Sequence, residues 1–132
     1  MIDDQQFEKI VVSAIRELPE YFRKKMENIT IHIEDFPDQN ILKNLGFRSP
    51  YSLLGVYQGV PLSHRGIHYR NVMPDRIIIF RKPLLHKGRS DQMIKKNIKK
   101  VVIHEIGHFF GLSDAELYRI EKNNIQSSKD KA

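Results

Sequence analysis

Cysteine is absent from this chain of 132 residues. Without it the chain has no disulfide, no thiolate nucleophile and no cysteine zinc site, so a bound metal would need histidine and carboxylate ligands. No apolar run approaches the roughly 20 residues that cross a bilayer. The first residues, MIDDQQFEKI, are acidic where a secretory signal carries lysine or arginine. These absences predict a cytoplasmic protein without a membrane span.

Charge of one sign is not concentrated in any segment, although the formal net charge is +6. The densest basic stretch, KKNIKK at 95–100, falls on a predicted helix that needs a solvated face anyway. Lysine and arginine can bind nucleic acid by neutralising phosphates. Spread charge, however, is more typical of a soluble surface with weak association. Nucleic acid is therefore an open but not a favoured partner.

Hydrophobic periodicity predicts strands flanked by helices. Apolar residues at helical spacing predict a helix over 7–18, which Pro19 kinks or ends. Residues 29–36, ITIHIEDF, alternate as in a half-buried strand, and FPDQN follows as a turn. In a loop-rich middle, LLGVYQG at 53–59 suits a short edge strand, and DRIIIFRKP at 75–83 indicates a buried central strand. Three strands flanked by helices predict a small α+β domain.

A long helix is predicted over about residues 91–110, with Ser90 or Asp91 as its N-cap. An apolar stripe along this helix must face the core, while the lysines near its start occupy a solvated side. Further along, Ile103 and Phe110 fill that same side with apolar groups. We therefore expect the end of the helix to be buried nearly all round. Polar groups buried there need partners such as a metal.

The stretch HEIGHFFGLSD, residues 104–114, lies at this buried end. His104 and His108 fall one turn apart on the same helix face, with Glu105 beside them. Two imidazoles at this spacing can bind Zn²⁺. Zinc lowers the pKa of a bound water towards about 7, and the neighbouring glutamate can take the water's proton. The pattern predicts a zinc site with His104 and His108 as ligands and Glu105 as general base.

Two interpretations are open for Asp114. A turn at Gly111 lets the chain swing back, so that Asp114 can approach as the third metal ligand. Alternatively, Asp114 is a first-turn residue of a short helix capped by Ser113, where a helix dipole favours a carboxylate. We expect the ligand role.

Other side chains are weaker candidates. His64 and His68 are also four residues apart, but Gly66 argues against a helix that would hold them on one face, so a polar contact near the cleft is the better prediction. Three tyrosines could supply an oxyanion donor beside zinc, although packing is the expected role of each: Tyr51, Tyr57 and Tyr69.

HEIGHFFGLSD resembles the HExxHxxGxxD signature of zincin metallopeptidases, in which aspartate replaces the third histidine of the metzincin motif. Over roughly residues 50–120, the stretches LLGVYQGVPLSHRG, PDRIIIFRKPL and VVIHEIGHFFG resemble, in order and spacing, a family of small bacterial proteins with a minimal zincin-like fold. The resemblance implies a mixed sheet of three to four strands packed against helices, zinc as cofactor, and a peptide or protein substrate. We expect one zincin-like metallopeptidase domain over residues 1–126 and a disordered tail over 127–132.

The chain departs from full metzincins in one respect. Residues 115–132 are too few for the methionine-containing turn that floors the metzincin site, and Met73 lies upstream. We therefore expect the lower wall of a cleft to come from the middle loops or a partner, or to be missing. An aspartate ligand also cancels one unit of metal charge, so the metal would be a weaker Lewis acid than in a three-histidine site.

Three functions are compatible with the sequence. The first, which we favour, is a zinc metallopeptidase whose extended substrate pairs with the LLGVYQG edge. The second is a zinc-dependent RNA-processing hydrolase, against which stands the ending GLSD in place of a third histidine. The third is a catalytically silent zincin-fold binding module, which leaves Glu105 without a role. Neither the substrate sequence nor the oligomeric state can be read from the chain.

Overall fold

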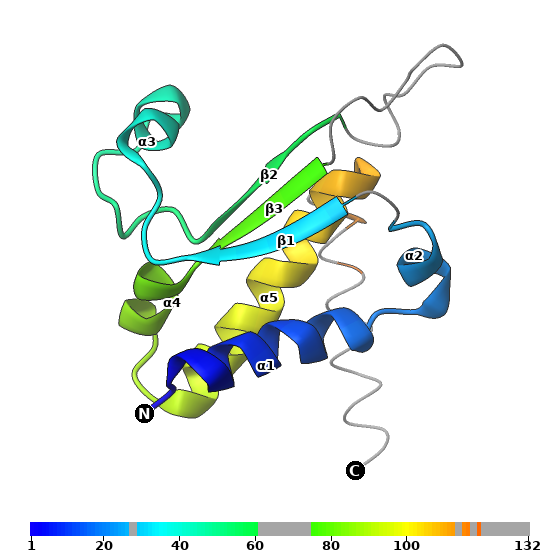
Figure 1. Cartoon of the computed structure of the whole chain (residues 1–132), viewed down its shortest axis with the longest axis horizontal. Coiled ribbons are helices and arrows are strands. Elements are labelled where there is room, and N and C mark those ends of the chain that lie inside the picture. Colours follow the sequence, from blue (N-terminus) through cyan, green and yellow to red (C-terminus); the bar gives the residue numbers. More distant parts are fainter. Residues whose placement is uncertain (27–28, 61–74, 113–114, 117–118, 120–132) are drawn as a thin grey trace.

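The computed structural model describes residues 1–26, 29–60, 75–112, 115–116 and 119. A three-stranded sheet in the order β1-β3-β2 lies over two long helices (Figure 1). β1 (Ile29–Glu34) runs parallel to β3 (Asp75–Phe80), and β2 (Gly55–Gln58) runs antiparallel to it. This confirms an α+β fold with a small mixed sheet. Among the described helices, none is long and apolar enough to cross a membrane.

The central strand is β3, as its unbroken apolar run predicts. Ile77 and Ile79 are fully buried against the helices beneath the sheet. Ile78 and Phe80 point to the other face, where they pack with Leu42 in a second, smaller core. β1 shows the alternation expected of a half-buried strand.

α1 (Asp4–Arg16) and α5 (Asp91–Phe110) lie side by side beneath the sheet (Figure 1). α1 begins with a capping box between Asp3 and Gln6. The break at Pro19 separates it from α2 (Glu20–Lys24). The main core consists of residues from both long helices and β3, chiefly Phe7, Val11, Ala14, Ile77, Ile79, Ile98, Val102 and Ile106.

The bounds of α5 match the prediction of a helix over about 91–110. Ser90 is the N-cap, and its side chain accepts a hydrogen bond from the backbone N–H of Met93. At the other end Gly111 is left-handed, with φ of 76°. Its N–H and that of Leu112 donate to the carbonyls of His108 and Gly107, each over 3.0 Å.

Two helices were not expected from the sequence. α3 (Gln39–Leu45) lies where we predicted turn and loop; Asp38 caps its start, and left-handed Gly46 ends it. α4 (Arg81–Lys87) begins directly after β3, so the strand ends three residues before Pro83 instead of reaching it. Pro83 is tolerated in the first turn of α4 because backbone N–H groups there have no helical acceptor.

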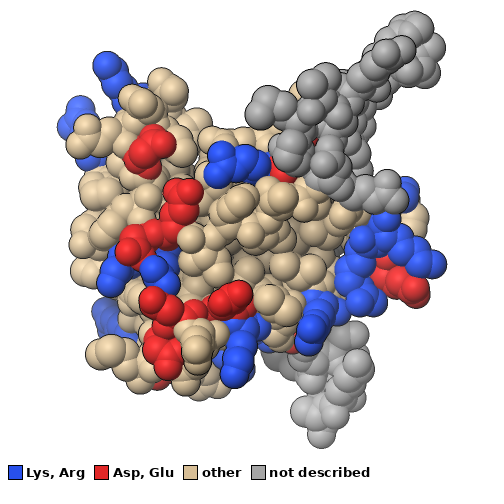
Figure 2. Space-filling model, in the orientation of Figure 1, with Lys and Arg blue, Asp and Glu red and all other residues tan. Residues whose placement is uncertain are grey.

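Charged side chains are mixed on the face shown in Figure 2. Lysine and arginine alternate with aspartate and glutamate around its margin, while its centre is mostly uncharged. On this face the structure agrees with the expectation of spread charge.

Candidate metal centre

The end of α5 brings three potential metal-binding side chains together. His104, Glu105 and His108 each offer one ligand atom, and these atoms lie within 4.8 Å of one another. Among the residues that the structure describes, they form the one such group of three or more. The two imidazole rings are 4.5 Å apart between centroids, as expected for residues one turn apart.

The burial of this cluster differs from the sequence-based expectation. The histidines are only partly buried, and 40% of the His108 side chain is exposed. Glu105 is the buried member, with 6% of the residue exposed. Glu105 is therefore the most buried of the three side chains, and together with His104 it lines a pocket beside the helix.

The buried carboxylate of Glu105 has one oxygen atom without a hydrogen bond. Its Oε2 atom has no hydrogen-bond partner in the described structure. Nδ1 of His108 is 3.4 Å away, which is close enough for an ion pair but does not meet hydrogen-bond geometry. Burial raises the pKa of Glu105 above its ordinary value, and the nearby His108 and His104 oppose this rise in part. A cation at this position would favour the ionised carboxylate, so the residues present fit a metal site.

A glycine on the edge strand allows Glu105 to lie where it does. A Cβ atom on Gly55 would stand 2.9 Å from Cγ1 of Val101, 3.2 Å from Cγ of Glu105 and 3.3 Å from the carbonyl oxygen of Ile78. Only glycine lets β2 approach α5 this closely. The sequence indicated only that LLGVYQG suits an edge strand, so it did not predict the contact of Gly55 with the candidate centre.

The other candidate residues are either elsewhere or outside the described chain. The Tyr57 hydroxyl donates a hydrogen bond of 2.8 Å to buried Asp75, and its ring meets Phe109 edge to face. Tyr51 packs against His86 on α4. Five predictions lie outside the described residues: Asp114 as ligand, Ser113 as cap, and the positions of His64, His68 and Tyr69. Met73 and the tail at 127–132 also lie outside the described residues. The structure describes only residues 115, 116 and 119 of the predicted terminal helix, and all three are helical.

Comparison with known proteins agrees with this geometry. No curated protein matches the chain. A family model for zincin-like metallopeptidases matches residues 26–124, which include the whole sheet, α4, α5 and the three clustered side chains. Zincins hold a metal, usually zinc, and the clustered histidines and glutamate could bind one. Because the match covers well over half of the chain, this protein belongs to the zincin-like metallopeptidase family.

Proposed function

We propose that this protein is a zinc-dependent peptidase in which His104 and His108 hold the metal and Glu105 is the general base. The observation that carries the proposal is the buried carboxylate of Glu105, whose Oε2 has no hydrogen-bond partner, beside two histidines with ring centroids 4.5 Å apart. A buried carboxylate oxygen without a hydrogen bond lowers the stability of the fold, and groups of this kind cluster at functional sites. Membership of a metallopeptidase family supports the same function.

The proposed ligand set is two histidines and one carboxylate. Imidazole nitrogen and carboxylate oxygen are common zinc ligands, and catalytic sites use three protein ligands so that one position stays open. Asp114 is our proposal for the third ligand, on the strength of the sequence motif alone.

When bound, zinc would act as a Lewis acid that makes water acidic near neutral pH and polarises a carbonyl group. Glu105 accepts the proton of the attacking water at a carboxylate oxygen while the water oxygen bonds to the carbonyl carbon. Glu105 then delivers that proton to the leaving amide nitrogen as the carbon–nitrogen bond breaks, which yields a carboxylic acid and an amine; the acid then releases its proton to solvent. Burial, which raises the pKa of Glu105, suits a group that must both take and return a proton.

The substrate path that we propose runs along β2. Within the described sheet, β2 pairs with β3 on one side only. Its first residue, Gly55, lies against Glu105. An extended peptide that added to the outer edge of β2 would therefore bring its backbone close to Glu105.

The test combines metal analysis with peptide cleavage. Purified protein should carry one zinc per chain and cleave members of a fluorogenic peptide library. Glu105→Gln should keep its zinc and lose activity by about 10²–10⁴-fold, the usual contribution of a general base. Asp114→Ala should lose zinc, whereas Glu8→Gln, at an exposed carboxylate on α1, should change neither property. Cleavage that survives in Glu105→Gln, or protein that binds no zinc, would overturn the proposal.

A further inference from the structure

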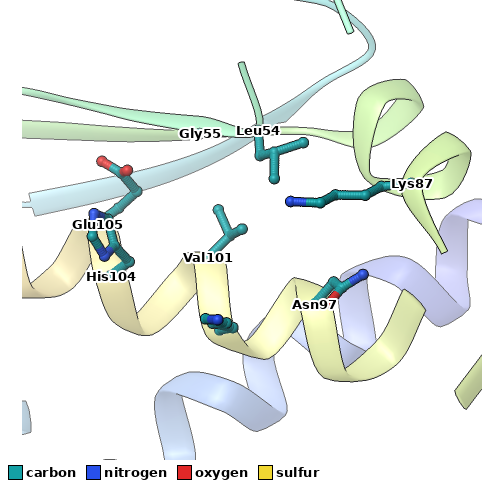
Figure 3. Close-up of a pocket in the computed structure, with 8 residues that line it drawn as sticks. Leu54, Gly55, Lys87, Asn97, Val101, His104 and Glu105 are labelled. Atoms are coloured by element: carbon teal, nitrogen blue, oxygen red, sulfur yellow. The ribbon is translucent and has the colours of Figure 1, made fainter. Parts of the chain in front are cut away.

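A pocket of about 250 Å³ opens directly beside the candidate centre. α5 forms one wall, the start of β2 forms the roof, and the end of α4 closes the far end (Figure 3). His104 and Glu105 stand at one end and Lys87 at the other. The volume is below the about 300–1,000 Å³ of pockets for drug-sized ligands, so it suits a single side chain or chain terminus.

Basic and amide side chains form part of the pocket lining. The Lys87 side chain reaches from α4 towards Leu54 and Val101 (Figure 3). Lys100 and Asn97 also line the pocket from α5. The apolar part of the lining is provided by Leu54 and Val101.

Most lysines in the described part of the chain, Lys87 and Lys100 included, form no ion pair with an acidic side chain. Lys99, the neighbour of Lys100, pairs at 2.8 Å with Glu17, the C-cap residue of α1, and Lys24 pairs with Glu20 at 3.4 Å. Neither Lys87 nor Lys100 forms an ion pair in the part of the chain that the structure describes. Glu105 is the one acidic residue in the lining, and it lies at the end opposite Lys87 (Figure 3). The pocket therefore offers two positive charges and an amide to an incoming anion.

We propose that this pocket binds a carboxylate of the peptide substrate, held by Lys87 and Lys100, while the scissile bond lies at His104 and Glu105. This inference rests on the proposed peptidase function and specifies its substrate class. The methylene groups of an acidic residue would pack on Leu54 and Val101, and Asn97 could donate an amide hydrogen bond. The carboxylate has two sources, an aspartate or glutamate side chain or the C-terminus of the substrate.

The experiment measures cleavage and binding separately, both with full-length zinc-loaded protein. Four matched peptides are compared: glutamate or glutamine next to the scissile bond, each with a free or amidated C-terminus. Binding is measured by fluorescence anisotropy with the Glu105→Gln variant, which holds peptides without cleaving them. The lysine variants are Lys87→Met, Lys100→Met and both together, with Lys96→Met as control, because Lys96 is an exposed lysine of α5 that does not line the pocket.

We expect kcat/KM for carboxylate peptides to exceed that for their uncharged counterparts by about tenfold or more. Each lysine substitution should reduce this preference by about two- to fivefold, the range for exposed charge pairs, and both together should nearly abolish it. Lys87→Glu should reverse the preference towards a lysine-containing peptide, which loss of packing could not do. Preference only for glutamate identifies the side chain, and preference only for a free C-terminus identifies the terminus; either outcome supports the proposal.

Three results would overturn it. Equal cleavage of charged and uncharged peptides would do so, as would a preference that the double lysine variant retains. Single-stranded RNA that displaces the peptide from wild type, but not from the double variant, would assign the pocket to phosphate instead. If wild type cleaves no peptide, the peptidase proposal fails, while anisotropy still decides whether the lysines bind a carboxylate.

Discussion

The sheet has two edges, and each borders a hollow against a long helix. The hollow between β1 and α1 is the larger, about 480 Å³ against about 250 Å³ for the pocket between β2 and α5. Each is lined by at least one histidine and at least one acidic side chain of the described chain. Size and residue types alone would therefore favour the β1 hollow as a binding site.

The two hollows differ in whether their polar groups have partners. In the β1 hollow, Nε2 of His32 is 3.0 Å from the hydroxyl of Thr30, and Arg81 bridges Asp4 and Asp35. Its acidic side chains are also exposed to water. In the β2 pocket, Glu105 is buried and its Oε2 has no hydrogen-bond partner. An unsatisfied buried carboxylate distinguishes a candidate catalytic site better than volume does.

The largest expected difference between the two hollows is in metal affinity. His104→Ala or His108→Ala should weaken zinc binding by more than about 100-fold. Loss of a residue that only hydrogen-bonds to a metal ligand already lowers metal affinity by about 10–100-fold. His32→Ala should leave it unchanged, because His32 lies across the sheet with a hydroxyl partner. Competition with a chromophoric zinc chelator measures both. Equal losses in all three variants would remove the distinction between the hollows.

A methyl group on Gly55 should have the next largest effect. The added Cβ of Gly55→Ala would meet Val101, Glu105 and the Ile78 carbonyl at 2.9–3.3 Å, and overpacking of this kind costs about 1–3 kcal/mol of unfolding free energy. Gly55 does not have a positive φ, so the effect is steric. Urea unfolding measures the loss. Adding Val101→Ala removes the nearest atom and should recover part of the loss; if the two losses simply add, close approach is not their cause.

The smallest predicted effect concerns the stability of metal-free protein. Burial raises the folded-state pKa of Glu105 above its ordinary value of 4.5. The neutral carboxyl group is thus favoured by folding, and its stabilisation is complete below pH 4.5 and lost as pH rises through the folded pKa. At pH 8, Glu105→Gln should therefore raise the unfolding free energy by about 1 kcal/mol, since an unsatisfied buried polar group costs about 1–3 kcal/mol.

Thermal unfolding in the presence of a chelator, followed from pH 4 to pH 8, measures this effect. The gain in Glu105→Gln should shrink as the pH falls. Glu8→Gln in the β1 hollow is the control and should follow wild type throughout, because Glu8 is exposed. A gain that does not change with pH would indicate improved packing instead of relief of a buried charge.

Much of the fold followed from local patterns in the sequence. Alternation in ITIHIE and the unbroken run IIIF predicted an outer and a central strand, and the caps of α5 predicted its bounds. α3 and α4 were missed because each has only seven residues. Helices this short depend on tertiary packing, as when Leu42 and Leu84 enter the cores. Asp38 and Gly46 were nevertheless visible signals for α3.

The candidate site likewise has features that the sequence could predict and features that it could not. The spacing of His104 and His108 follows from helix geometry, so their proximity could be predicted from the sequence. The burial of Glu105 could not, because it depends on how closely β2 crosses α5. The sequence also could not predict that Lys87 and Lys100 line one pocket, because they belong to different helices. The stretch KKNIKK alone indicated only a solvated helix face.

The sequence by itself determined which side chains share a helix face and where α5 begins and ends, because both depend on interactions within a few residues. The tertiary structure decided which of those side chains is buried with an oxygen that lacks a hydrogen bond, and which lysines line the pocket beside it. Contacts between β2 and α5 join residues far apart in the chain, and no local period encodes them. The motif therefore locates the chemistry, and the packing around Gly55 determines its surroundings.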